Sequence, residues 1–213
     1  MRHPLLFVLV GFFGSKEVFP QLTNKLHVGV MFESLCPDSQ KFIKDLYRNW
    51  ADVSNYVDIK FIPFGKGASI AGGSTFVCQH GPLECKGNRL MSCALARIPG
   101  QDLQVEYVNC FMDKFRHSRT DENEFGQECA TSIGLNLNEI LECYQSSEGA
   151  VLQLRAEQDT LKFLPKFIPT IIYNQEFNQE LQDASLNDFR DVVCQLSQKL
   201  FGRLCTRLSI LRL

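Results

Sequence analysis

The sequence has no excess of charge of either sign, and beyond its N-terminus it has no long apolar run. Its 213 residues include 22 Lys and Arg against 24 Asp and Glu, which gives a formal net charge of -2. Because nucleic-acid backbones are bound through Lys and Arg, this balance removes the electrostatic case for a nucleic-acid partner. No segment approaches the roughly twenty apolar residues that cross a bilayer, so we expect no transmembrane anchor.

Several catalytic and processing motifs are also missing. The chain has no Gly-x-Ser-x-Gly elbow, phosphate-binding loop or dinucleotide fingerprint, so hydrolase and nucleotide-dependent chemistry lack support and no cofactor is expected. It has no Asn-x-Ser/Thr sequon, which favours simple secretion over sugar-tagged delivery to lysosomes. No linker or internal repeat divides it, and we therefore predict a single domain over residues 17–213.

The N-terminus is typical of a secretory signal peptide. Arg2 and His3 precede an apolar run from Pro4 to Gly14, which ends at small and charged residues. A charged start followed by about eleven apolar residues matches a cleaved leader, and the run is too short to span a bilayer. We predict a signal peptide over residues 1–16 and a secreted protein, with the endolysosomal lumen as the alternative location.

Nine cysteines are consistent with an oxidising compartment. The odd number leaves at least one thiol free, in a mixed disulfide or bridging two chains. Cys36 stands apart in the sequence and is the candidate for that thiol, whereas Cys194 and Cys205 flank the last helical segment and are expected to pair. Structural disulfides are expected among the other six, in pairings that spacing leaves open: Cys78, Cys85, Cys93, Cys110, Cys129 and Cys143.

The first third of the chain has the pattern of strand, helix and strand. Lys25–Phe32 alternates, Asp38–Trp50 has apolar residues at helical spacing, and Val57–Phe64 is a second strand pattern. Pro37 suits the first turn of the helix, where its missing N–H costs nothing. A βαβ unit makes its two strands parallel and places Cys36 at the strand-to-helix turn.

The middle of the chain is predicted to be a helical insertion held by disulfides. Residues 65–73 are glycine-rich and are expected to form a loop, and no convincing strand lies between Leu83 and Leu164. We expect the insertion to span about 70–164, with each bridge contributing about 2–4 kcal/mol of stability. Helical patterns cover five segments, of which the first four carry cysteine: 88–98, 102–117, 123–133, 137–145 and 149–163.

The last part of the chain returns to the sheet. Thr170–Tyr173 is a predicted strand, followed by a polar turn at Asn174–Asn178. The spacing of Ser185 and Asp188 is like that of a capping box and predicts a helix from there through about Phe201.

Cys36 is the candidate redox residue. It precedes a helix N-terminus, whose unpaired N–H groups and partial positive charge stabilise a thiolate. This arrangement resembles thioredoxin-like proteins, which also place a cis proline before a later strand, opposite the cysteine. Ile168-Pro169-Thr170 resembles that element, so Pro169 is the candidate cis proline. The alternative for Cys36 is a half-buried small residue. The resemblance implies an α/β fold with a thioredoxin-like sheet and a large disulfide-stapled helical insertion.

The most specific pattern lies at residues 78–93. This segment resembles the signature C-Q-H-G-x-x-E-C-x-x-N-x-x-x-x-C of the gamma-interferon-inducible lysosomal thiol reductase (GILT) family, and the resemblance extends from about Lys25 to Leu200. It implies a reductase of protein disulfides, in which the first cysteine of a C-x-x-C pair attacks the substrate and the second releases it. All eight fixed positions are present: Cys78, Gln79, His80, Gly81, Glu84, Cys85, Asn88 and Cys93.

At the C-x-x-C pair the sequence departs from the family. The first cysteine corresponds to Cys36, but the partner position holds Ser39, whose hydroxyl stays protonated and forms no S–S bond. Asp38 beside the thiol also disfavours a thiolate. The resemblance therefore implies mixed disulfides with disulfide-bearing proteins through Cys36, with weak or absent reductase turnover. The alternative is a redox-inactive secreted protein whose surface binds a protein or cell-surface partner.

Zinc is another interpretation of the Cys- and His-rich stretch. The runs between Cys78, Cys85 and Cys93 hold six and seven residues, whereas structural zinc sites prefer two to four between paired ligands. A secreted context favours disulfides as well, so no metal is expected. For His80 we favour a structural role, as a hydrogen-bonding residue of a disulfide-bound loop.

Overall fold

The computed structural model describes residues 24–117 and 126–205. The signal peptide predicted at 1–16 therefore lies outside the described residues, as does the start of the helix predicted at 123–133. Within the two described ranges, none of the helices combines the length and the apolar character that a membrane span needs.

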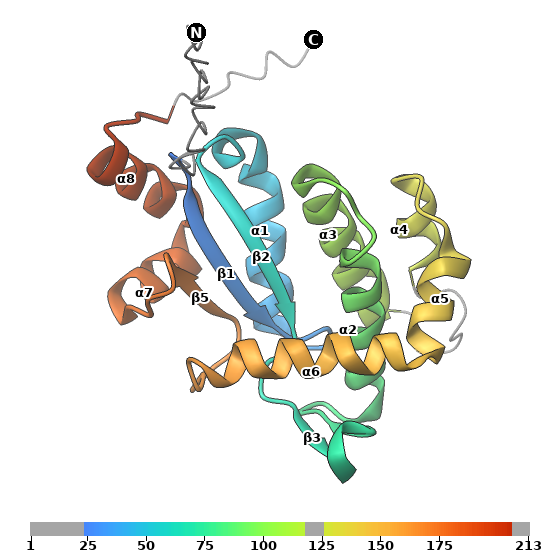
Figure 1. Cartoon of the computed structure of the whole chain (residues 1–213). Coiled ribbons are helices and arrows are strands. Elements are labelled where there is room, and N and C mark those ends of the chain that lie inside the picture. The colour runs from blue at the N-terminus through green and yellow to red at the C-terminus, as the bar shows by residue number, and fades with distance from the viewer. Residues whose placement is uncertain (1–23, 118–125, 206–213) are drawn as a thin grey trace, which may run out of the picture.

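A three-stranded sheet lies at the centre of the molecule (Figure 1). Strand β1 (Leu26–Phe32) is its middle strand, with β2 (Val57–Pro63) parallel on one side and β5 (Thr170–Tyr173) antiparallel on the other. Successive side chains of a strand point to opposite faces, and β1 buries one face along its whole length but the other only at Met31, because His27 is exposed. Val28 and Val30 belong to the main core, whereas Met31 belongs to a second, smaller core on the other face.

Helix α1 (Pro37–Val53) joins the two parallel strands, as the sequence pattern predicts. It packs against α3 (Gln101–His117) and α8 (Phe189–Phe201), beside the sheet (Figure 1). Burial of each large apolar side chain on such a helix contributes about 1.5–3 kcal/mol. The side chains that α1 buries at helical spacing are Phe42, Ile43, Leu46 and Trp50.

The chain between β2 and β5 begins with a small hairpin. Strands β3 (Ala68–Ile70) and β4 (Thr75–Val77) pair antiparallel around the short 3-10 turn η1 (Ala71–Gly73). The prediction of a loop over residues 65–73 is therefore wrong at 68–70, where the chain forms β3. Gly72 and Gly73 both have positive φ, a backbone conformation that glycine adopts at little cost, and they reverse the chain there.

Helices fill the rest of this insertion. Helix α2 (Pro82–Leu95) starts six residues before the predicted 88, because Gly81 and Pro82 already supply its beginning. It packs against α5 and α6, and both α2 and α6 contact β2. The helices that follow α2 and α3 are α4 (Gln127–Ser132), α5 (Leu137–Gln145) and α6 (Ser147–Leu161).

The C-terminal part has one more helix than the sequence predicts. Helix α7 (Gln179–Asn187) precedes α8, so Ser185 lies inside a helix and the prediction that it starts one is wrong. The Ser185 hydroxyl donates to the Leu181 carbonyl one turn earlier in α7, and it also contacts the hydroxyl of Tyr173 in β5. The residue that caps α8 is Asp188, whose carboxylate accepts the N–H of Asp191.

All nine cysteines lie in the described ranges, and eight of them are bonded. One bridge joins α2 to α5, one joins α3 to α4, one closes the loop before α2, and one ties α8 to the segment after it. Cys36 is the free cysteine. The pairs are Cys93–Cys143, Cys110–Cys129, Cys78–Cys85 and Cys194–Cys205.

Candidate active site

The signature loop, residues 78–85, is closed by its own disulfide. Cys78 is bonded to Cys85 across a separation of seven residues. Gly81 has φ +90° at the start of α2, a value that a side chain would strain. The loop therefore has a fixed shape, and it presents the ring of His80 next to the first turn of α2.

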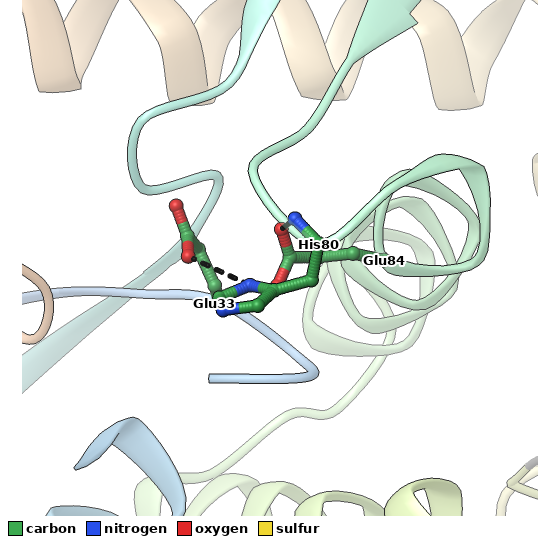
Figure 2. Close-up of side chains that lie close together, drawn as sticks. All are labelled: Glu33, His80 and Glu84. Carbon is green, nitrogen blue, oxygen red and sulfur yellow. Dashed lines mark hydrogen bonds and ion pairs between the residues drawn. The ribbon is translucent and has the colours of Figure 1, made fainter. Parts of the chain in front are cut away.

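A buried carboxylate that the sequence analysis missed faces this loop. Glu33 follows β1 directly and is fully buried. Its Oε1 accepts the backbone N–H of Lys66 at 2.7 Å, and its Oε2 lies 3.4 Å from Nδ1 of His80 (Figure 2). The same Nδ1 is 2.5 Å from Oε2 of Glu84, and the His80 backbone N–H donates to the other Glu84 oxygen. A Glu directly after a buried strand and three residues before Cys36 was the available sequence signal.

Close packing around Glu33 leaves no room for a side chain at Gly65. A Cβ there would lie 2.2 Å from Cγ of Glu33, far inside van der Waals contact. Burial raises the pKa of the Glu33 carboxyl. The Lys66 backbone N–H opposes that shift, the nearby Glu84 adds to it, and His80 also opposes it, with a raised pKa as the net result.

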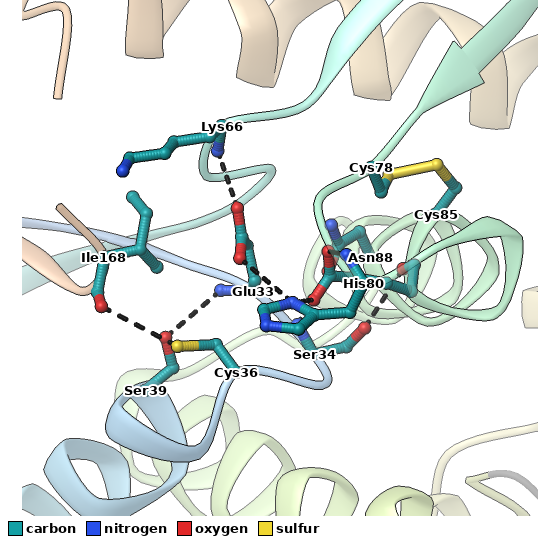
Figure 3. Close-up of polar contacts among 11 residues, drawn as sticks. Glu33, Ser34, Cys36, Ser39, Lys66, Cys78, His80, Cys85, Asn88 and Ile168 are labelled. Carbon is teal, nitrogen blue, oxygen red and sulfur yellow. Dashed lines mark hydrogen bonds and ion pairs between the residues drawn. A yellow bond between two sulfur atoms is a disulfide. The ribbon is translucent and has the colours of Figure 1, made fainter. Parts of the chain in front are cut away.

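Cys36 caps the N-terminus of α1 at the next turn of the chain. Its N–H donates to the Glu33 carbonyl at 3.2 Å, and its own carbonyl accepts from Gln40. The thiol is 7% exposed, and Sγ lies 3.6 Å from the carbonyl oxygen of Ile168 (Figure 3). The peptide bond between Ile168 and Pro169 is cis. The structure therefore brings the candidate thiol and the candidate cis proline together.

Ser39 lies in the first turn of α1, on the same side as Cys36. It is fully buried, and its Oγ accepts the backbone N–H of Glu33 at 3.3 Å (Figure 3). The Ser39 hydroxyl is thus part of the hydrogen bonding that holds the turn. Asp38, by contrast, is exposed.

The Cys36 turn and helix α2 are joined by buried hydrogen bonds. The Ser34 N–H donates to Oδ1 of Asn88 at 2.9 Å, and the Ser34 hydroxyl donates to the Glu84 carbonyl at 3.0 Å. A Cβ on Gly87 would lie 2.5 Å from Oγ of Ser34, so this approach requires glycine. Asn88 of the signature therefore positions the turn that carries Cys36. Of the remaining signature residues, Gln79 is exposed, and Cys93 is bonded to Cys143.

A cavity of about 170 Å³ lies against the cis proline, and its lining includes Ile168, whose carbonyl oxygen is 3.6 Å from Sγ of Cys36. Two larger cavities, of about 360 and 330 Å³, lie along β2 and α6, and neither is lined by a cysteine. Cys36 does not line the smaller cavity itself, which has both apolar and charged walls. Its lining residues are Asp38, Lys41, Phe42, Phe167, Ile168, Pro169 and Leu186.

Solved structures with the same arrangement of elements are bacterial DsbA proteins. DsbA from Xylella fastidiosa superposes with a TM-score of 0.55 at 15% identity, covering 83% of this chain and 89% of that one. A single-residue variant of Pseudomonas aeruginosa DsbA superposes with a TM-score of 0.58 at 12% identity, covering 86% and 91%. At such identities the likeness shows the fold alone, and it confirms the predicted thioredoxin-like α/β class.

Sequence relatives give the family. GILT-like protein 1 of Drosophila melanogaster is 33% identical over 199 residues, covering 86% of this chain and 79% of that protein. The gamma-interferon-inducible lysosomal thiol reductase-like protein of Anopheles gambiae is 33% identical over 189 residues, covering 81% and 77%. The family described as gamma interferon inducible lysosomal thiol reductase matches residues 27–133. These matches, over a thioredoxin fold with four disulfides, show that the chain belongs to the GILT family.

Proposed function

We propose that this protein exchanges disulfides through the single thiol of Cys36, and that it forms mixed disulfides with protein substrates. The observation that carries the proposal is the position of Cys36, free at the N-terminus of α1 and beside Pro169. The unpaired N–H groups of a helix N-terminus stabilise the thiolate that attacks a disulfide. The cavity lined by Ile168 and Pro169 offers room for the substrate chain.

The reaction balances without a second cysteine if a small thiol takes part. The Cys36 thiolate attacks one sulfur of the substrate disulfide, so a bond from Sγ forms and the substrate S–S bond breaks, releasing one substrate thiolate. A small-molecule thiol then displaces the substrate, and a second one frees Cys36. In sum, the substrate disulfide is reduced, two small thiols are oxidised to their disulfide, and their two protons go to the substrate thiols.

Turnover is slow in this scheme because Ser39 supplies no thiol. In a C-x-x-C protein the second cysteine acts at the high effective concentration of an intramolecular group, on the order of millimolar or more. Here the hydroxyl of Ser39 is buried and hydrogen-bonded to the Glu33 N–H. The mixed disulfide therefore persists until an external thiol meets it, and reductase turnover is weak or absent.

A second candidate function is a redox-inactive binding protein on the same scaffold. The observation that favours it is the burial of Cys36, which is 7% exposed and whose sulfur lies against the Ile168 carbonyl. In this case the thiol stays unreactive, and a protein or cell-surface partner binds elsewhere on the surface.

For the location, we propose an oxidising compartment, either outside the cell or in the endolysosomal lumen. The support is the four disulfides among the described residues, since such bonds persist in secreted and lumenal proteins and are rare in reducing compartments. Secretion into medium by cells expressing the full chain, set against retention in acidic vesicles, distinguishes the two.

Trapping of the mixed disulfide tests the proposal. The native protein is incubated without reductant, one sample with oxidised glutathione and a separate sample with insulin. Intact masses are measured after acid quenching. We expect one adduct per chain, located at Cys36 by peptide mapping and reversed by added thiol. Cys36→Ala should form none. Ser74→Ala is the control, because Ser74 is exposed and lies in the β3–β4 hairpin away from Cys36, and it should form the same adduct.

The opposite outcome is equally clear. If native Cys36 forms no adduct with either disulfide, yet alkylates readily after denaturation, the thiol is inert in the folded protein. The thiol-exchange proposal is then wrong, and the binding-protein candidate replaces it.

A further inference from the structure

Three side chains of metal-ligating type, from two separate parts of the chain, meet next to the Cys36 turn (Figure 2). Glu33 lies at the end of β1, His80 in the signature loop and Glu84 in the first turn of α2. Each offers one ligand atom, and the three atoms all lie within 4.8 Å of one another. We infer that these residues bind a divalent transition metal, with Zn²⁺ as the best fit.

Each carboxylate has one oxygen held by the backbone and one left for an ion. Oε1 of Glu33 accepts the Lys66 N–H at 2.7 Å, and Oε1 of Glu84 accepts the His80 N–H at 3.0 Å. The two remaining oxygens face the same ring nitrogen, Nδ1 of His80. The amide hydrogen bonds thus orient both carboxylates for binding through one oxygen each, as hydrogen bonds to the ligands do in known metal sites.

One of those oxygens is buried without a hydrogen-bond partner. The Glu33 side chain is 1% exposed, and its Oε2 receives no hydrogen bond. Nδ1 of His80 carries at most one hydrogen, and Oε2 of Glu84 already lies 2.5 Å from it. A single N–H cannot serve two carboxylates with good geometry, and a buried polar atom left unsatisfied is costly. One cation among the three atoms satisfies both oxygens.

Charge leads to the same conclusion. The side chains of Glu33 and Glu84 are both 1% exposed and face one imidazole, which balances at most one of two negative charges. Buried charges are stable when they are paired or coordinate a metal. A divalent cation matches the two carboxylates and leaves the imidazole neutral, the form in which it binds metals.

The donor set favours zinc over the common oxygen-loving cations. Ca²⁺ and Mg²⁺ take six or more ligands, mostly oxygens, whereas Zn²⁺ binds one nitrogen and two oxygens readily in a tetrahedral site. With bonds of about 2.0–2.2 Å, neighbouring ligand atoms of such a site lie about 3.3–3.5 Å apart. The Glu33–His80 distance of 3.4 Å already fits, and the Glu84–His80 contact has to lengthen by about an ångström or less. His80, 35% exposed, gives the ion access from solvent.

Binding of Zn²⁺ to the disulfide-bonded protein tests the inference, with isothermal titration calorimetry and metal analysis after dialysis as the readouts. We expect one Zn²⁺ per chain, and a loss of affinity of more than about tenfold in both Glu33→Gln and His80→Gln. His27→Gln is the matched control, since His27 also faces a carboxylate, Asp58, at 3.9 Å but lies outside the cluster. It should bind as the wild type does, and so should Cys36→Ala.

Cobalt spectroscopy of the wild type covers the case in which a variant misfolds. Bound Co²⁺ should show the visible bands of a four-coordinate site and no thiolate charge-transfer band, because the three ligands are nitrogen and oxygen. A thiolate band, Zn²⁺ binding that survives both cluster substitutions, or loss of binding in Cys36→Ala would each overturn the inference. Trapping of Cys36 by glutathione is measured without added metal, so the two proposals fail separately.

Discussion

Two turns in this protein start helices at a proline, and they differ in how sulfur is used. The Cys36 turn leads into α1 at Pro37 and carries a lone thiol, whereas the signature loop leads into α2 at Pro82 and lies inside the Cys78–Cys85 bridge. The first turn is shaped by hydrogen bonds, including the one that Ser39 accepts from Glu33. The second is shaped by a covalent bond.

The difference shows that a hydroxyl can hold the form of a turn without a bond between two sulfurs. Because the Ser39 hydroxyl accepts a backbone hydrogen bond, the turn stays closed and Cys36 stays at the helix N-terminus. The hydroxyl preserves geometry but supplies no second step of disulfide exchange. Shape and chemistry are therefore separable in the first turn, and the following predictions test that separation.

The largest effect is expected for Ser39→Cys, which restores the second thiol in the first turn. An intramolecular thiol should shorten the lifetime of the Cys36 mixed disulfide by at least about tenfold, because its effective concentration exceeds that of external thiols. Insulin reduction, followed by turbidity, should rise by a similar factor over wild type. Ser39→Ala should show no rise. If Ser39→Cys shows none either, the site has lost more than one sulfur.

Removing covalent bonds tests how far the second turn depends on its bridge. Cys78→Ala with Cys85→Ala should lower the free energy of unfolding by about 2–3 kcal/mol, because the bridge closes a loop of only seven residues. Cys93→Ala with Cys143→Ala should cost about 4 kcal/mol, since that bridge spans fifty residues. Urea unfolding of both double variants gives the values. A larger loss at the shorter loop would contradict the loop-entropy explanation.

The next effect is expected from the hydrogen bond that joins the Cys36 turn to helix α2. Asn88→Ala leaves the buried Ser34 N–H without its acceptor and should destabilise the protein by about 1–3 kcal/mol. Asn49→Ala is the control, because the Asn49 amide bonds within α1 and is partly exposed. Chemical denaturation and the rate of adduct formation at Cys36 are the readouts. Equal stability of the two variants would mean that the hydrogen bond from Ser34 to Asn88 adds no stability to the folded protein.

The smallest effect concerns an ionic cluster away from both turns, formed by Asp159, Lys60 and Lys162. It measures how much one surface carboxylate contributes to the loss of stability in acid. Burial opposes ionisation of Asp159, but Lys162 and Lys60 outweigh it and hold the pKa of Asp159 below its ordinary value. A lowered pKa adds stability above the ordinary value of about 4, and this stability is lost as pH falls through the folded-state pKa. Asp159→Asn should therefore reduce the stability difference between pH 7 and about pH 2.5, by under about 1 kcal/mol because the lysines are exposed. An unchanged difference in urea midpoint would contradict this.

The predictions from sequence succeeded where local pattern decides structure. Strand Thr170–Tyr173 and the helix at 137–145 have the predicted bounds, and α1 follows the strand before Cys36 as expected. Helix α7 was missed because its residues are mostly polar and its buried positions are Gln182 and Ser185, which an apolar pattern does not reveal.

Within the candidate site, the sequence singled out Cys36 and Pro169. The structure brings them together, because the Cys36 thiol contacts the carbonyl oxygen of Ile168, the residue before Pro169. Nothing in the sequence indicated that Glu33 faces His80, because the contact joins distant segments. The sequence also gave no reason for the glycine at position 87. The structure supplies one, because Ser34 of the Cys36 turn lies against Gly87 and leaves no room for a side chain.

The sequence by itself determined the kinds of chemistry available: an odd number of cysteines with Cys36 as the candidate free thiol before a helix, a serine three residues on, and a family signature with all of its fixed residues. Tertiary structure alone decided which cysteines pair among the helices, and that two buried carboxylates converge on one imidazole. The physical reason is the distance along the chain over which each interaction acts. Helix starts and strand alternation depend on neighbours along the chain, whereas pairing and burial of charge depend on which surfaces the packed core brings together.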